Sequence, residues 1–421
     1  MSLITRFGKK AKKTIKLLGP GLITGSSDDD PSGIASYSQA GAAFGFGTLW
    51  TALITFPLMA GIQEMSARIG LITGDGLAGT IKKNYSHKIL YLMLIFSFPA
   101  IILNIGADIA GMGAVANLLV PALPSFIFSI LFTALLIPSI IFWSYKKIAS
   151  VMKYLCLILL VYLIVPLIVK TDWTQAVKSS FFPKFEFSRE YLMMLVAVLG
   201  TTISPYLFIW QASMEVEELK KKHKGFFVDK KFISRMRTDI TYGMFYSNLI
   251  MYFIILTTGT VLYNAGIHQI DTVEQAAQAL KPLAGNFAYL LFSLGIIGTG
   301  FLAIPVLAGS LSYALAETFL WQQGLNKKFK EAKPFYAVIA VSLIIGLCIN
   351  FIGISPIQAL IYTAVLYGLT APVLIIIIML ICNNKKIMGH HTNGLWSNVL
   401  GVLTFILMAF SGAALIYFYF H

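Results

Sequence analysis

The chain has 421 residues, of which 57% are hydrophobic and only 12% are charged. This composition is typical of polytopic membrane proteins, and it excludes an ordinary soluble domain. The formal net charge of +14 would suggest nucleic acid as the partner of a soluble protein, but here we expect the basic residues to orient the chain in a lipid bilayer and no nucleic acid to bind.

Apolar runs long enough to cross a hydrocarbon core of ~30 Å, at about 20 residues each, recur along the whole chain. They predict an all-α membrane protein with eleven transmembrane helices. The expected spans are Leu17–Phe44, Gly47–Thr73, Ile89–Leu119, Ser125–Trp143, Ile148–Val169, Tyr191–Val216, Thr238–Leu262, Phe287–Trp321, Phe335–Ile352, Ile357–Cys382 and Trp396–Phe420.

The first span is interrupted by three consecutive acids, Asp28, Asp29 and Asp30, which are followed by Pro31. A carboxylate at the bilayer centre costs about 3 kcal/mol, so such a residue usually marks an ion or substrate path. Proline removes a backbone donor and ends helices. We therefore predict a broken helix whose unwound middle lines a water-accessible cavity. The alternative is that the acids lie at a helix end among the lipid headgroups.

The sixth span has a similar interruption, because Gly200, Thr201, Thr202, Ser204 and Pro205 lie inside its apolar run. Interrupted segments at corresponding positions of two halves indicate an inverted-repeat transporter. Since the two broken segments are five spans apart, we expect one transport domain over residues 1–421, with repeats at about 17–169 and 191–382 and an extra helix at 396–420. The alternative is that the proline only kinks an ordinary helix.

Basic residues lie in the N-terminal tail and in every even-numbered loop, and the segment 220–237 is the richest in them. Because Lys and Arg collect on the cytoplasmic side, we expect a multi-pass protein of the cell (inner or plasma) membrane, with its N-terminus cytoplasmic and its C-terminus outside. A chain with this many spans suits a self-contained, monomeric transporter better than a channel with a symmetric pore.

Several motifs resemble those of the Nramp family of divalent-metal transporters, which share the leucine-transporter-like fold. The family has Gly-Pro-Gly, Asp-Pro-Gly-Asn and Gln-Ala-Gly in its first helix, Ala-Arg-Leu-Gly in its second, Thr-Asp-Leu-Ala in its third and Gly-Ala-Thr-Val-Met-Pro-His in its sixth. The similar segments here are Gly19–Gly21, Asp30–Gly33, Gln39–Gly41, Gln63, Ser66–Gly70, Thr73–Gly74, Gly106–Ala110 and Gly200–Tyr206.

The resemblance implies a metal site, and this chain departs from the family's ligand pattern. By position, Asp30 retains the family's Asp ligand and Thr201 supplies the backbone carbonyl. The family's Asn has become Gly33, and its Met has become Ser204. A thioether favours soft ions, so its loss leaves oxygen ligands that suit Mg²⁺ and Mn²⁺. The smaller residues also leave room for the water that Mg²⁺ retains. The pattern is similar to the Nramp-related magnesium transporter branch.

Two further departures follow. Tyr206, which we include in the metal site, replaces the family's His, and Gly111 replaces an acid of the family's proton path. We map the histidines to loops or to the chain end: His87, His223, His268, His390, His391 and His421. The membrane potential alone gives a divalent ion about 4.6 kcal/mol at 100 mV, roughly a thousandfold accumulation. We therefore expect import of Mg²⁺ or Mn²⁺ by alternating access, driven by the potential without proton coupling.

The sequence leaves more than one role open for four other acids. Asp28 and Asp29 could act around the ligands or draw cations inward, or could simply face solvent at the cavity mouth. Asp108 could bind metal transiently, take a proton or accept a packing hydrogen bond. Glu64 could belong to the pathway, although its spacing from Arg68 favours a simple ion pair on one helix face.

Other functions remain open from the sequence. A proton-coupled transition-metal symporter of the Nramp type is the first alternative. An amino-acid symporter of the same fold is less consistent with three acids at the break, because they would repel a substrate carboxylate. An intramembrane aspartyl protease would need a second catalytic Asp, and Gly74–Asp75–Gly76 lies in a loop. We therefore expect no enzyme activity and no cofactor, with divalent cations and the lipid bilayer as partners.

Overall fold

The computed structural model describes residues 20–143, 157–221 and 230–420, and these form helices and loops without a β-strand. The first half contains α2 (Pro20–Asp28), α3 (Pro31–Phe44), α4 (Trp50–Thr73), α5 (Leu77–Asn84), α6 (His87–Leu119), α7 (Ser125–Phe142), the 3₁₀ turn η1 (Leu157–Leu160) and α9 (Val161–Ile168). The all-α prediction is confirmed.

The second half begins with a helix in the loop before the sixth span. Its helices are α10 (Trp173–Phe181), α11 (Arg189–Thr202), α12 (Pro205–Lys221), α13 (Lys230–Val261), α14 (Val273–Ala277), α15 (Lys281–Ala284), α16 (Ala288–Phe319), α17 (Lys333–Ile349), α18 (Pro356–Asn383), α19 (Lys385–Met388) and α20 (Leu395–Phe420). Short 3₁₀ turns, η2 (Tyr263–Ala265), η3 (Gln278–Leu280), η4 (Gly285–Phe287) and η5 (Gly389–His391), accompany them.

The described residues contain seven helices that are long and apolar enough to cross a membrane. Three other predicted spans correspond to the pair α2 and α3, to α4 and to the shorter α17. The fifth predicted span, Ile148–Val169, corresponds to η1 and α9, and its residues 148–156 lie outside the described residues. The helices α5 and α10 were not predicted, because they lie in loops and are not apolar enough to suggest a span.

Both predicted helix breaks are present. The first lies between α2 and α3, where Asp30 has extended backbone angles and caps α3, and Pro31 is its first residue. Proline suits this position because its fixed φ fits the helix and its missing N–H would have no partner there. The second lies between α11 and α12, where Ile203 and Ser204 are not helical and Pro205 begins α12.

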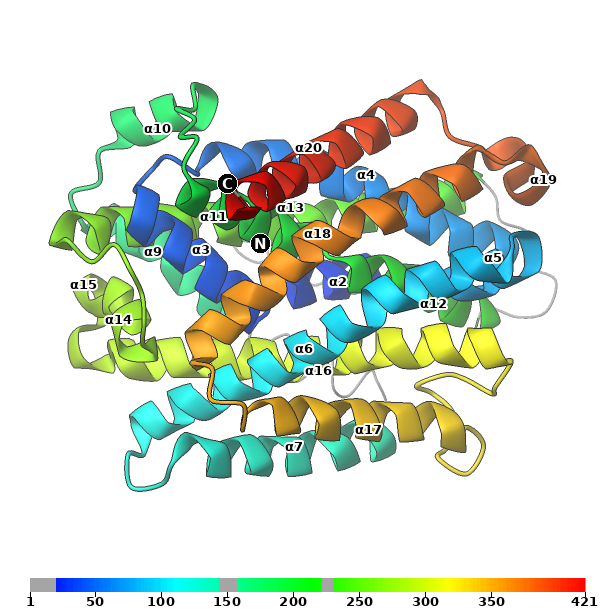
Figure 1. Ribbon diagram of the computed structural model, residues 1–421, viewed down its shortest axis with the longest axis horizontal. Coiled ribbons are helices and arrows are strands. Elements are labelled where there is room, and N and C mark those ends of the chain that lie inside the picture. Colours follow the sequence, from blue (N-terminus) through cyan, green and yellow to red (C-terminus); the bar gives the residue numbers. More distant parts are fainter. Residues whose placement is uncertain (1–19, 144–156, 222–229, 421) are drawn as a thin grey trace, which may run out of the picture.

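The broken helices lie inside the bundle (Figure 1). The segment α3 packs against α13, α11 and α18, and α2 packs mainly against α13, with further contacts to α12 and α16. The long helices α6 and α16 lie side by side, and α7 and α17 cover α6 at the margin of the bundle. Every side chain from Ser27 to Ala42 is buried as a result.

The contact between α2 and α13 is a backbone contact. A methyl group placed on Gly25 would lie 2.2 Å from the carbonyl oxygen of Gly243, far inside van der Waals distance. Only glycine therefore fits at Gly25 without moving one of the two helices. The backbone amide of Gly21 in the same helix donates to Asp239 of α13 at 2.7 Å, which fixes the start of α2.

Candidate metal site

Asp30 is the hydrogen-bonding centre of the first helix break. One carboxylate oxygen accepts from the backbone amide of Gly33 and from the hydroxyl of Ser32, both at 2.7 Å. The other oxygen accepts from the side-chain amide of Asn104 in α6 at 2.9 Å. With 1% of its surface exposed, this carboxylate is held by neutral donors from two helices. Charge-assisted bonds of this kind fix its geometry.

Asp28 and Asp29 are fully buried, at 0% exposure, so the alternative that they simply face solvent at the cavity mouth is wrong. The packing of α13 over the break encloses them. Ser247 of α13 donates to Asp28 at 2.7 Å and lies 3.3 Å from a carboxylate oxygen of Asp29. The remaining oxygen of each carboxylate has no hydrogen-bond partner. We predicted that the three aspartates line a water-accessible cavity, but in this structure all three are enclosed by protein.

Asp108 on α6 faces the first turn of α3, near the backbone amide of Ser32, and it is also fully buried. Neither of its carboxylate oxygens has a hydrogen-bond partner of normal geometry, and the three roles expected for Asp108 stay predictions. Gly111 lies one turn further along α6. A methyl group placed on it would contact Leu360 at 3.2 Å and Pro31 at 3.8 Å.

The sixth segment meets the first at Thr201 and Gly33. The hydroxyl of Thr201 lies 3.4 Å from that of Ser32, and a methyl group on Gly33 would lie 3.3 Å from the Thr201 hydroxyl. The hydroxyl of Ser204 forms no hydrogen bond with Asp30. It donates back to the carbonyls of Thr201 and Gly200, at 2.5 and 3.1 Å, and so caps the end of α11.

Tyr206 joins the two broken helices. Its hydroxyl donates to the carbonyl of Ser27 at 2.9 Å, and this carbonyl lies at the end of α2. The ring of Tyr206 lies against that of Tyr367 in α18, with 5.7 Å between the ring centres. The Tyr367 hydroxyl is buried and has no hydrogen-bond partner. Tyr206 is therefore a structural link as well as a residue beside the candidate site.

Glu64 forms an ion pair with Arg68 at 3.2 Å, as its spacing predicts, and a second pair with Arg237 at 3.1 Å. Arg68 also donates to loop residues after α19, among them the carbonyl of His391 and the side chain of Asn393. This charged cluster ties α4 to α13 and to the loop before α20. Its charges are already paired, in contrast to those of the aspartates.

Sequence reasoning missed four polar residues of the site: Ser32, Asn104, Ser247 and Thr363. Asn104 precedes Asp108 by four residues, so helical periodicity alone would have placed both on one face of α6. Thr363 of α18 donates to the carbonyl oxygen of the Asn104 side chain at 3.0 Å. Only the packing of α13 against α2 reveals Ser247.

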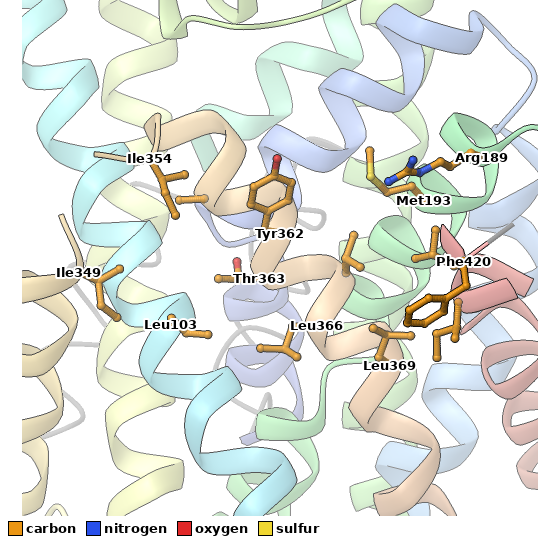
Figure 2. A pocket seen from close by; sticks show the side chains of 14 residues that line it. Leu103, Arg189, Met193, Ile349, Ile354, Tyr362, Thr363, Leu366, Leu369 and Phe420 are labelled. Atoms are coloured by element: carbon orange, nitrogen blue, oxygen red, sulfur yellow. The ribbon is translucent and has the colours of Figure 1, made fainter. Parts of the chain in front are cut away.

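A large cavity of about 640 Å³ lies beside the site but is apolar (Figure 2). It is a groove between α6, α11, α18 and α20, lined mainly by aliphatic side chains such as Leu103 and Leu366, with Arg189 at one end. None of the four aspartates lines it. Thr363 is the point of contact, because it lines the groove and also bonds to Asn104. The groove therefore borders the site and is not an aqueous path to it.

Comparisons with known proteins agree with the fold. A family model described as "Natural resistance-associated macrophage protein-like" (Nramp) matches residues 21–418. The chain is 23% identical over 416 residues to the divalent metal cation transporter MntH of Caldanaerobacter subterraneus subsp. tengcongensis, covering 97% of this chain and 94% of that relative. It is 23% identical over 418 residues to MntH of Mycobacterium leprae, covering 95% and 91%.

Solved structures show the same architecture. A manganese transporter of Eremococcus coleocola superposes with a TM-score of 0.74 at 16% identity, covering 94% of this chain and 84% of that one. The inward-facing conformation of Mhp1 gives a TM-score of 0.50 at 13% identity, covering 95% and 90%. At these identities the likeness concerns the fold, and it agrees with the predicted leucine-transporter-like arrangement.

Proposed function

The chain belongs to the Nramp family, and from this membership we propose that it imports divalent metal cations across the membrane by alternating access. The two relatives above are named as divalent metal cation transporters, and the first solved structure is named as a manganese transporter. For this chain we propose Mg²⁺ and Mn²⁺ as cargo, at a site centred on Asp30. This proposal includes membership of the magnesium branch.

The observation that carries this proposal is a group of buried carboxylates without a basic partner. Asp28, Asp29, Asp30 and Asp108 are at most 1% exposed, and among the described residues none of them forms an ion pair. Isolated charges are very costly to bury, so buried charges are normally paired or bind metal. A divalent cation beside Asp30 would supply the missing positive charge.

The donors around Asp30 favour a hard ion. Its contacts are hydroxyl and amide groups, and the residue that replaces the family's thioether ligand, Ser204, offers only a hydroxyl. Oxygen ligands suit Mg²⁺ and Mn²⁺, whereas Cd²⁺ and Zn²⁺ bind sulfur and imidazole more readily. Gly33 contributes no side chain at all, so we propose that the cation keeps part of its hydration shell there.

We further propose that transport needs no proton coupling. Tyr206 holds its hydroxyl on the carbonyl of Ser27, so it is a fixed link between the broken helices, and Gly111 offers no titratable group. Asp108 favours the opposite view, because its carboxylate has no hydrogen-bond partner and could carry a proton. A proton-coupled Nramp-type symporter therefore stays the second candidate function.

Flux measurements in proteoliposomes test both proposals. Vesicles with an internal pH dye and an inside-negative potential should take up Mg²⁺ and Mn²⁺, Ca²⁺ poorly, and show no internal acidification. Cd²⁺ binding tens of times tighter than Mg²⁺ would overturn the hard-ion proposal. Acidification that scales with metal flux and disappears in Asp108→Asn would establish the symporter instead.

The remaining proposals concern placement in the membrane. We propose a monomer of the cell membrane with its N-terminus cytoplasmic and its C-terminus outside, built from the two predicted repeats. The support for this orientation is the distribution of Lys and Arg over the loops. Labelling of cysteines introduced into the basic and the opposite loops of intact cells would test it.

A further inference from the structure

We propose that Asn104 is a ligand of the transported cation, and that its side-chain amide turns over when the cation binds. This inference rests on the proposed function and names one more residue of the same site. In the structure the amide nitrogen of Asn104 faces Asp30 and its carbonyl oxygen faces Thr363. Half a turn about the last side-chain bond exchanges the two atoms and directs the oxygen toward Asp30.

The amide of Asn104 forms hydrogen bonds with two residues, Asp30 and Thr363. The residue is fully buried on α6, with its nitrogen 2.9 Å from the Asp30 carboxylate and its oxygen 3.0 Å from the Thr363 hydroxyl. The far side of Thr363 is the mainly apolar groove (Figure 2). The amide is therefore held between a carboxylate and a hydroxyl on two different helices.

Thr363 can satisfy Asn104 in either orientation. A hydroxyl group has one proton to donate and two lone pairs that accept. The Thr363 hydroxyl lies 2.8 Å from the carbonyl oxygen of Leu360 as well as 3.0 Å from Asn104. Its proton can bond to Leu360 while a lone pair accepts from the Asn104 nitrogen. Turning the amide therefore leaves its Thr363 end paired. At the other end the Asp30 carboxylate loses the donor from Asn104, and the bound cation would take the place of that donor.

A cation at Asp30 would drive the turn. While the carboxylate is without a cation, the positively polarised amide protons of Asn104 stabilise its charge. A divalent ion bound to the carboxylate would repel those protons and attract the amide oxygen. Mg²⁺ and Ca²⁺ take oxygen ligands from carboxylates, carbonyls and water. The oxygen of Asn104 is of the required type and lies next to the predicted ligand.

The site otherwise offers few side-chain ligands. Within the described residues no three acidic, His or Cys side chains are arranged to hold a metal ion together. The Thr201 carbonyl already accepts from Ser204. Gly33 has lost the carboxamide that the Nramp pattern places after the Asp. Asn104 brings a carboxamide to the same carboxylate from another helix, so it takes over that role from a different position in the sequence.

Binding measurements on purified protein test the ligand. Asn104→Leu keeps the side-chain size and removes both polar atoms, and we expect it to weaken Mn²⁺ and Mg²⁺ binding by about 10- to 100-fold in calorimetric titration, the range for one lost charged contact. Thr363→Val should weaken binding by about tenfold through the orientation of the amide. Asn104→Asp keeps an oxygen toward the cation and should retain binding. Asn117→Leu, on the same helix but at its exposed end, is the control and should bind as the parent protein does.

Infrared difference spectra show the turn itself. In protein labelled with ¹³C at the asparagine side-chain carbonyl, Mg²⁺ should shift one carbonyl band, and Asn104→Leu should abolish that shift while Asn117→Leu keeps it. If Asn104→Leu binds both cations normally and the band shift persists, while Asp30→Asn binds neither, the inference is wrong and the proposed function stands. If the parent protein binds neither Mg²⁺ nor Mn²⁺, both are wrong.

Discussion

Substitutions of Asp30 separate its part in folding from its part in cation binding. The side chain caps α3 through the Gly33 amide and also accepts from Ser32 and Asn104. Asn retains one side-chain oxygen and is as good a helix cap as Asp. Asp30→Asn should therefore keep the cap but lose the charge, whereas Asp30→Ala loses both.

The hydrogen bonds set the expected magnitudes. In Asp30→Ala the side chains of Ser32 and Asn104 can rotate to other partners, but the Gly33 amide is fixed by the helix and stays unpaired. One buried donor without a partner costs about 1–3 kcal/mol of unfolding free energy. Asp30→Asn should stay within about 1 kcal/mol of the parent protein, because the cap remains. Loss of the charge that pairs with a buried cation costs about 3–5 kcal/mol, so uptake should fall at least about hundredfold in both variants.

Two measurements on the same preparations check this reasoning. Thermal unfolding in detergent should place Asp30→Asn close to the parent protein and Asp30→Ala below it. Uptake of Mn²⁺ into proteoliposomes should be lost in both. If Asp30→Asn retained more than about half of the parent's uptake, Asp30 would not be the charged ligand. A twofold loss of uptake is far smaller than the tenfold change that corresponds to about 1.4 kcal/mol. Equal stability of the two variants would refute the capping argument.

Three other substitutions have definite expected results. Ser204→Met introduces a thioether at the end of α11 and should move flux competition toward Cd²⁺; an unchanged ion order would count against the selectivity argument. Tyr206→Phe removes the donor to Ser27 and should cost about 1 kcal/mol of stability while leaving the pH dependence of uptake unchanged; an altered pH profile would assign Tyr206 to a proton path. Asp239→Ala removes the acceptor of the Gly21 amide and should speed hydrogen exchange in α2, and protection equal to that of the parent protein would show that this bond does not hold the helix.

Local chemistry predicts both helix breaks. A proline cannot continue the preceding hydrogen-bond pattern, and an aspartate before it caps the next helix, so Asp30 and Pro31 determine the first break without help from distant residues. At the second break Pro205 ends the hydrogen-bond pattern in the same way, but Ser204 before it donates back to Thr201 and Gly200 of α11. These features need only neighbours in sequence, which is why the all-α fold and its interrupted segments follow from the sequence.

Features that depend on packing between distant helices could not be predicted in the same way. The burial of Asp28 results from α13, more than two hundred residues away, and the sequence does not show that Ser247 meets it. Similarly, the pair between Glu64 and Arg68 follows from spacing, but its second partner Arg237 does not. Asn104 is intermediate, because its periodicity with Asp108 is visible while its contact with Asp30 is not.

The glycine contact between α2 and α13 has a consequence for how this protein can vary. Gly25 is three residues before Asp28, and Gly243 is four residues before Ser247, so this contact sets the separation at which that aspartate and serine meet. A side chain at Gly25 would have to push the two helices apart. A substitution can therefore inactivate the protein without altering any group that binds the ion. In a saturation mutagenesis screen, Gly25 should tolerate no replacement.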